Sequence, residues 1–146
     1  MTARQATVDD SQVAARLRYV LVRMTRTLRR EGHSKLSPSQ ISALATLEEF
    51  GPVRISALAT HESIDPSVAT RVVASLETQG LTERHDDPED KRACLIDLSD
   101  VGRRALDELW SERTIGLSSR LERLTPNERL VIESALPALE KMARDN

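Results

Sequence analysis

The sequence predicts a mainly helical fold that contains one small β hairpin. Apolar residues recur at helical spacing in most segments, and each of these segments is bounded by residues that begin or end helices. Two short strand-like segments near the middle of the chain enclose a polar loop with a proline. The length of 146 residues fits one domain over residues 1–146, built as a compact core with helical extensions.

The first expected helix covers residues 12–30 and has two different faces. Its apolar stripe consists of Val13, Leu17, Val20, Leu21, Met24 and Leu28. Its opposite face carries Arg16, Arg18, Arg23, Arg26 and Arg29. A basic face of this kind is usually solvated, and contact with a phosphate backbone is the alternative.

Three shorter helices are expected next. The second begins at Ser37-Pro38-Ser39-Gln40, a capping box, and ends at Gly51-Pro52. The third runs from about Ile55 to His61. The fourth, residues 66–79, follows the N-cap Asp65 and ends at Gly80, where a positive φ is expected.

The hairpin is expected to follow directly. Its strands are Leu81 to His85 and Ala93 to Leu98, and the second strand alternates so that Cys94 shares an inward face with Ile96 and Leu98. The connecting loop, residues 86–92, is polar and contains a proline, as a wing does. Helix, turn, helix, strand, loop, strand is the order of a winged helix-turn-helix, which we place at residues 37–98.

Two long helices end the chain. Ser99 caps a helix over residues 100–124, and a second capping box at residues 125–128 begins a last helix that reaches about residue 143. Pro137 must kink this last helix or remove a hydrogen bond. Because one small core cannot absorb all these apolar stripes, residues 9–36 and 99–146 are expected to form a dimer.

Composition excludes several classes of function. Aromatic residues make up 2% of the chain, too few for a surface that stacks on single-stranded bases. No apolar run approaches the roughly 18 residues of a membrane span, and a lone cysteine forms no internal disulfide. A cytoplasmic protein is therefore expected.

Net charge does not favour nucleic-acid binding. The formal charge is -2, the sequence pI is about 5.9, and residues 53–98 hold five basic side chains against nine acidic ones. DNA binding would therefore depend on a few well-placed groups. The outer face of the fourth helix supplies the best candidates for the major groove, namely Pro66, Ser67, Thr70 and Arg71.

The loop supplies candidates for the minor groove. Arg92 follows Asp90 by two positions, so the aspartate could support the guanidinium while Lys91 and Arg92 approach DNA. A solvated charge cluster is the alternative for this loop, as a plain polar surface is for the helix. Further candidate phosphate contacts are Ser37, Gln40, Arg54 and Arg84.

Three motifs, at residues 65–73, 76–81 and 87–92, resemble those of the MarR family of bacterial transcription regulators. The last resembles the wing signature, in which the Asp and the Arg two positions apart are diagnostic. The resemblance implies a homodimer on a pseudo-palindromic operator, released by a small phenolic or anionic effector, with repression the more usual outcome. The effector-binding residues are not indicated, and Pro137 departs from the family pattern.

Other functions have weaker support. Cys94 could sense oxidants, although an inward position predicts a buried thiol. His33, His61 and His85 are too scattered for a metal site, and the chain has no phosphate loop or nucleophile motif, so we expect no cofactor and no enzyme activity. A winged-helix module that binds only other proteins remains an alternative.

Overall fold

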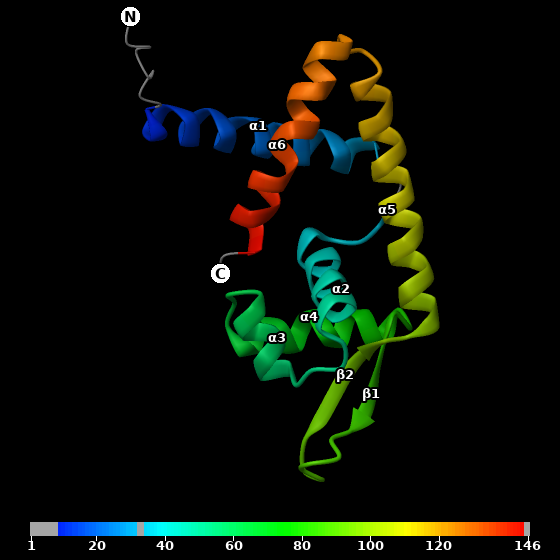
Figure 1. The fold of residues 1–146 in the computed structure, drawn as a ribbon. Helices are drawn as coiled ribbons and strands as arrows, with labels where there is room; N and C mark the ends of the chain where they lie inside the picture. Colours follow the sequence, from blue (N-terminus) through cyan, green and yellow to red (C-terminus); the bar gives the residue numbers. More distant parts are fainter. Residues whose placement is uncertain (1–8, 32–33, 145–146) are drawn as a thin grey trace, which may run out of the picture. The chain divides into compact units, whose positions relative to one another are not determined.

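The computed structural model describes residues 9–31 and 34–144 (Figure 1). Within that part of the chain it contains α1 (Asp10–Glu31), α2 (Pro38–Phe50), α3 (Ile55–His61), α4 (Pro66–Thr78), β1 (Thr82–Asp86), β2 (Cys94–Leu98), α5 (Asp100–Leu121) and α6 (Pro126–Arg144). The prediction of a mainly helical chain with one hairpin is confirmed.

The chain divides into two compact units. One unit, His33–Ser111, contains α2 to α4, the hairpin and the first half of α5, and we call it the winged unit. The other, the terminal unit, joins Met1–Gly32 with Glu112–Asn146. Residues 99–111, which the sequence pattern grouped with the terminal helices, belong to the winged unit in the structure.

The helix starts follow the predicted capping chemistry. Ser37 and Gln40 form a reciprocal capping box, in which the Ser37 N–H donates to Gln40 Oε1 at 2.8 Å and the Gln40 N–H to Ser37 Oγ at 3.3 Å. At α4 the Asp65 carboxylate accepts the Ser67 N–H at 2.8 Å. Hydrogen bonds from Ser67 hold the pKa of Asp65 below its usual value. Gly80, just past α4, has φ of +69°, as predicted.

The core of the winged unit gathers large apolar side chains from α2, α3, α4, β2 and the first half of α5. Leu44 and Leu47 from α2 and Leu76 from α4 are fully buried. The same cluster includes Leu58, Val73, Ile96, Leu98, Leu106 and Leu109. Burial of each such side chain contributes about 2 kcal/mol before the loss of conformational entropy is counted. This core fixes α4 and the hairpin against α2.

The hairpin is antiparallel, with Thr82 opposite Leu98 and Asp86 opposite Cys94. A single residue, Val53, forms an isolated antiparallel β-bridge with Ile96 of β2. Its N–H donates to the Ile96 carbonyl at 3.0 Å, and the Ile96 N–H donates back at 2.8 Å. The base of the hairpin is thereby fastened to the segment between α2 and α3.

Cys94 is exposed, so the expectation of a buried thiol is wrong. Ile96 and Leu98 are buried as expected, but burial decreases along β2 toward the loop. The alternating pattern correctly grouped the three residues on one face. The hairpin, however, projects beyond the helices that cover its base (Figure 1).

The terminal unit leaves much apolar surface exposed. Helix α6 buries none of its residues, and Ile115 of α5 and Val131 of α6 are each 67% exposed. Helix α6 continues past Pro137, where the missing N–H leaves the carbonyl of Glu133 without its helical partner. In the part of the chain that the structure describes, no helix is long and apolar enough to cross a membrane.

Candidate nucleic-acid interface

Helix α4 has the two faces that the sequence predicts. Ala69, Val73 and Leu76 are buried in the core. The four predicted contact residues lie on the exposed side: Pro66, Ser67, Thr70 and Arg71. The exposed side therefore has small side chains, which allow close approach to a groove, and one long cation.

Thr70 and Arg71 on this face differ in whether they are bonded within the protein. Thr70 Oγ1 donates to the Pro66 carbonyl at 2.8 Å, so the hydroxyl of this exposed residue is left to act as an acceptor. Arg71 makes no hydrogen bond or ion pair within residues 9–31 and 34–144. Its charge contributes to the lowered pKa of Asp65, after the larger effect of Ser67. Arg71 is thus an exposed cation in the second turn of α4, near the helix N-terminus.

Two of the predicted phosphate contacts, Ser37 and Gln40, are engaged within the protein. The Gln40 side chain accepts the Ser37 N–H through its oxygen and donates from Nε2 to Ser75 Oγ at 3.0 Å. This second bond links the first turn of α2 to α4. Gln40 therefore helps to fix α4 against α2, and its phosphate role stays a prediction.

Arg84 lies on β1 and is paired with α4. Its Nε is 2.5 Å and its Nη2 3.2 Å from the two carboxylate oxygens of Glu77. The hydrogen bond to Glu77 is the main reason that the pKa of Arg84 is raised. This bidentate pair offsets the positive charge at the base of the wing.

Arg54, the N-cap residue of α3, is also paired. Its Nε donates to Asp87 Oδ2 at 2.6 Å, and Nη2 lies 2.5 Å from the same oxygen. The Asp87 side chain is 6% exposed, compared with 44% for Arg54. Donation from the Glu89 N–H and from Arg54 holds the pKa of Asp87 below its usual value. Asp87 was not among the residues to which the sequence pattern gave a role.

The wing loop is held by backbone contacts. The Asp90 carboxylate accepts the Arg92 N–H at 3.0 Å, and the Asp90 carbonyl accepts the Ala93 N–H at 2.8 Å. No ion pair between the side chains of Asp90 and Arg92 occurs in the described loop. Asp90 therefore supports the main chain of Arg92, whereas their spacing in the sequence had predicted support of the guanidinium.

The five basic side chains between residues 53 and 98 fall into a paired group and an unpaired group. Arg54 and Arg84 are neutralised by Asp87 and Glu77. The remaining three have no carboxylate within ion-pair distance in the described structure: Arg71, Lys91 and Arg92. These three cations lie on the exposed face of α4 and on the wing. An acidic chain can therefore present unneutralised positive charge at the two places where a winged helix meets DNA.

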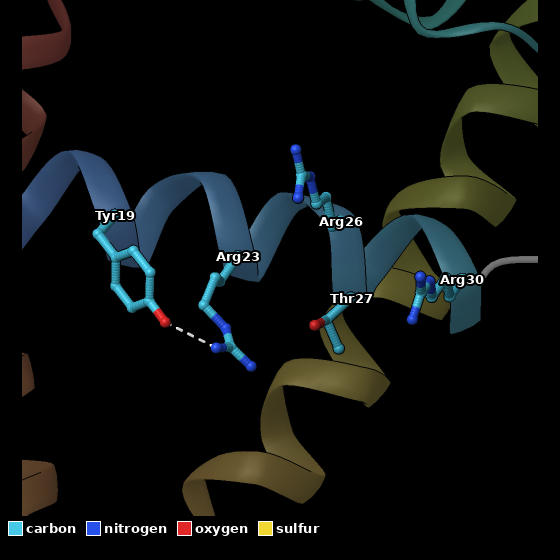
Figure 2. Close-up of a pocket in the computed structure, with 5 residues that line it drawn as sticks. All are labelled: Tyr19, Arg23, Arg26, Thr27 and Arg30. Carbon is cyan, nitrogen blue, oxygen red and sulfur yellow. Dashed lines mark hydrogen bonds between the residues drawn. The ribbon is translucent and has the colours of Figure 1, made fainter.

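A second basic feature lies on α1 in the terminal unit. Arg23 Nη1 donates to the Tyr19 hydroxyl at 2.7 Å, and its guanidinium lies 5.5 Å from the centre of the Tyr19 ring (Figure 2). These two residues line a hollow of about 290 Å³ with Arg26, Thr27 and Arg30. We call it the α1 hollow; three arginines line it, and in Figure 2 the side chains of Arg23 and Arg30 point to one side of α1 while Arg26 points to the other.

No metal site is formed in the described structure, where no three potential ligands of the His, Cys, Asp or Glu type gather. His61 stacks on Phe50 with ring centres 4.0 Å apart. His85 Nε2 lies 3.2 Å from Glu83 Oε1. His33 lies outside the described residues.

Comparisons with known proteins agree with this geometry. The profile of the MarR family matches residues 36–94. The chain is 36% identical over 128 residues to the uncharacterized HTH-type transcriptional regulator Mb0904 of Mycobacterium bovis, covering 87% of this chain and 90% of that protein. It is 27% identical over 106 residues to the uncharacterized regulator YdgJ of Bacillus subtilis, covering 73% and 65% of the two chains.

Solved structures show the same fold. A putative transcriptional regulator from Pseudomonas aeruginosa superposes with a TM-score of 0.82 at 32% identity, covering 96% of this chain and 99% of that one. A MarR family protein from Bacillus stearothermophilus gives 0.79 at 26% identity, with 94% and 99% covered. The apo form of wild-type MarR from E. coli gives 0.74 at 21% identity, with 86% and 95% covered, and shares the fold alone.

Proposed function

The chain belongs to the MarR family of HTH transcriptional regulators, and from that premise we propose that it is a homodimeric repressor that binds a pseudo-palindromic operator and responds to a small anion. Helix α4 enters the major groove and the wing enters the adjacent minor groove. Regulators of this family are not enzymes.

One observation carries the DNA-binding proposal. Of the five basic residues in residues 53–98, those on the outer face of α4 and on the wing are the ones without a carboxylate partner in the described structure. Unpaired cations release condensed counterions from DNA, whereas paired ones contribute little. Arg71 reaches base edges or a phosphate from α4. Arg92 suits a narrow minor groove, where the negative potential is enhanced.

Exposed apolar surface supports the homodimer. Val13, Val20 and Leu21 of α1 are each at least 45% exposed, and α6 buries no residue. Monomeric proteins rarely leave helical stripes of this extent in water. A second copy covers such stripes with matching ones and presents two recognition helices to two half-sites.

The α1 hollow supports the response to an anion. Its arginines at residues 23, 26 and 30 recur at helical spacing along α1, while the apolar stripe through residues 13, 20 and 24 occupies a different part of the helix surface. A partner subunit can therefore cover the apolar stripe and leave the arginines accessible. Guanidinium groups bind carboxylates through paired hydrogen bonds, and the Tyr19 ring offers a surface for an aromatic body.

Selection of DNA by the purified protein tests the main proposal. Fragments retained from a random pool at about 150 mM salt should share a two-fold symmetric motif whose half-sites are about one helical turn apart. The control is Arg104→Ala, which removes an exposed charge from α5 and changes neither α4 nor the wing. This variant should select the same motif as the parent. If the retained fragments share no motif, the proposal of a sequence-specific regulator is contradicted. The protein would then be a module that binds other proteins or DNA of any sequence.

Titration with sodium benzoate tests the anion response. Benzoate should release a selected operator from the parent protein and leave the operator bound to an R26A/R30A double variant. Arg16→Ala, also on α1 but outside the hollow, should respond like the parent. Equal release from all three proteins would contradict a role for the α1 hollow.

The exposed thiol makes the cysteine-based alternative testable. Cys94 should react with a thiol reagent in the folded protein, because it is exposed. We expect Cys94→Ser to bind operator with unchanged affinity, before and after peroxide treatment. Loss of binding after oxidation of the parent, but not of the variant, would instead support a redox-sensing regulator.

A further inference from the structure

We propose that Arg54 and Asp87 form a clamp that positions the wing, so that the contribution of Arg92 to DNA binding depends on this ion pair. The inference rests on the DNA-binding function proposed above. It assigns Arg54 a role different from direct phosphate contact. Arg54 and Asp87 are both positioning residues, since neither needs to touch DNA.

The Asp87 carboxylate joins two parts of the winged unit that are far apart in sequence. Its Oδ2 accepts from the guanidinium of Arg54 at 2.6 Å, across 33 positions of sequence. Its Oδ1 accepts the Glu89 N–H at 2.9 Å. One carboxylate therefore ties the start of α3 to the first turn of the wing loop.

Burial makes this contact costly to break. The Asp87 side chain is 6% exposed, and a carboxylate in that position is strongly unfavourable without a charged partner. Acidic neighbours reinforce the pairing from the other side. The pKa of Arg54 is raised first by its bonds to Asp87 and further by the charges of Asp90 and Glu89. The wing loop is thus held in a position where the positive charge of Arg54 offsets the negative charges of the loop.

The clamp is continuous with the β contacts at the base of the hairpin. Val53, next to Arg54, exchanges two backbone hydrogen bonds with Ile96, at 3.0 and 2.8 Å. The Asp87 N–H donates to the Ala93 carbonyl at 3.2 Å, directly beside Arg92. Any movement of Asp87 away from Arg54 therefore shifts the backbone that carries the Arg92 side chain.

The guanidinium of Arg54 has little left to offer a phosphate. Two of its nitrogens already contact Asp87, which carries the opposite charge. A neutralised cation releases no counterion from DNA. Arg54 is therefore expected to affect DNA affinity through the wing and to leave the salt dependence of binding unchanged.

A double-mutant cycle with Arg92 tests the clamp. Asp87→Asn keeps an acceptor for the Glu89 N–H and removes the ion pair, and Arg54→Gln removes the same pair from the other side. Each should weaken operator binding by about tenfold in the parent and by less than about twofold in the Arg92→Ala background. The matched control is Arg103→Gln, which breaks the Arg103–Asp97 pair of α5 and β2 and should act independently of Arg92.

The salt dependence separates the clamp from direct phosphate contact. If Arg54 bound a phosphate, Arg54→Gln would lower the slope of log affinity against log salt by about one per contact, and Asp87→Asn would strengthen binding by freeing the arginine. The clamp predicts that both variants weaken binding with unchanged slope. Either of the first two results would overturn it.

Amide hydrogen exchange without DNA gives a readout that does not depend on the proposed function. In both variants the N–H groups of Glu89, Arg92 and Ala93 should exchange faster, while those in the core of α4 remain protected. Should Arg54→Gln fail to fold because it leaves the buried Asp87 carboxylate without its partner, Asp87→Asn carries the test, since it removes that charge as well. Unchanged wing exchange overturns the clamp. A parent that selects no DNA motif, with faster wing exchange in both variants, overturns the proposed function and leaves the clamp as a purely structural contact.

Discussion

The backbone of Gly102, in the first turn of α5, passes so close to Leu81 that a β-carbon at residue 102 would lie 1.9 Å from the Leu81 carbonyl oxygen. The same region is fastened by polar contacts. Ser99 Oγ donates to the Gly80 carbonyl at 2.6 Å, and the Ser99 N–H donates to the Leu81 carbonyl at 3.1 Å. The end of α4, the start of β1 and the start of α5 therefore meet where only glycine fits.

Gly102→Ala should therefore lower the free energy of unfolding by about 3 kcal/mol, because overpacking against a backbone atom outweighs the gain in helix propensity. Gly80→Ala is the matched control. It has φ of +69° and nothing within 4 Å of the added carbon, so the cost should be about 1 kcal/mol. Urea denaturation at one protein concentration measures both, and equal losses would contradict the close approach.

Arg71→Ala should weaken operator binding by about 1 to 3 kcal/mol, because Arg71 is the one long cation among the small side chains of the α4 face. Fluorescence anisotropy with a labelled operator measures the affinity. Arg104→Ala again serves as control. A folded Arg71 variant with parental affinity would remove this residue from the interface.

Arg92→Ala should weaken operator binding and reduce the slope of log affinity against log salt by about one for each phosphate charge that the side chain neutralises per subunit. A contact confined to bases in the minor groove would change the slope less. Titrations at several salt concentrations measure both quantities together. An unchanged affinity would mean that the wing is only a solvated loop.

Asp90→Ala removes a negative charge from the wing, so electrostatics alone predicts tighter binding of DNA. We expect weaker binding, because the Asp90 carboxylate fixes the turn through the Arg92 N–H at 3.0 Å. Asp90→Asn keeps that acceptor without the charge and should bind at least as well as the parent. Tighter binding by the alanine variant would show that charge, and not the turn, is what Asp90 contributes.

Sedimentation without DNA should give a mass of about twice 16.3 kDa at micromolar concentration, since the exposed stripes of α1 and α6 need a partner. Val131→Glu, at a position 67% exposed in the single chain, should lower that mass toward one subunit. Ser134→Glu, a polar position of the same helix, is the comparison. A monomeric parent would contradict the dimer.

Local chemistry explains which elements could be predicted from the sequence. The starts of α2, α4 and α6 were predictable because caps depend on residues two or three apart in the chain, as at Ser37 and Gln40. Gly80 was predictable for the same reason. The exposed face of α4 followed from helical spacing alone.

The remaining features depend on contacts between distant residues. Alternation assigned Cys94 to the correct face of β2, but no periodicity shows how far along a strand the core extends. Val53 forms a β-bridge of a single residue, which is too short to have a sequence pattern. The partners of Arg54 and Arg84 were equally hidden, so both appeared as free cations. The position of Asp87 directly before Pro88 in the wing loop was the one available hint of the clamp.

The lone tryptophan of the chain, Trp110, is half-buried against the core of the winged unit, and its Nε1 donates to Glu48 Oε2 at 3.3 Å. With one tryptophan and one tyrosine in the sequence, emission excited at long wavelength arises from this single indole in each subunit. Its maximum depends on the polarity around the ring and on the nearby carboxylate charge. Intrinsic fluorescence therefore reports on the contact between α2 and α5 without any attached dye, and Glu48→Gln shows how much of that signal is due to the charge.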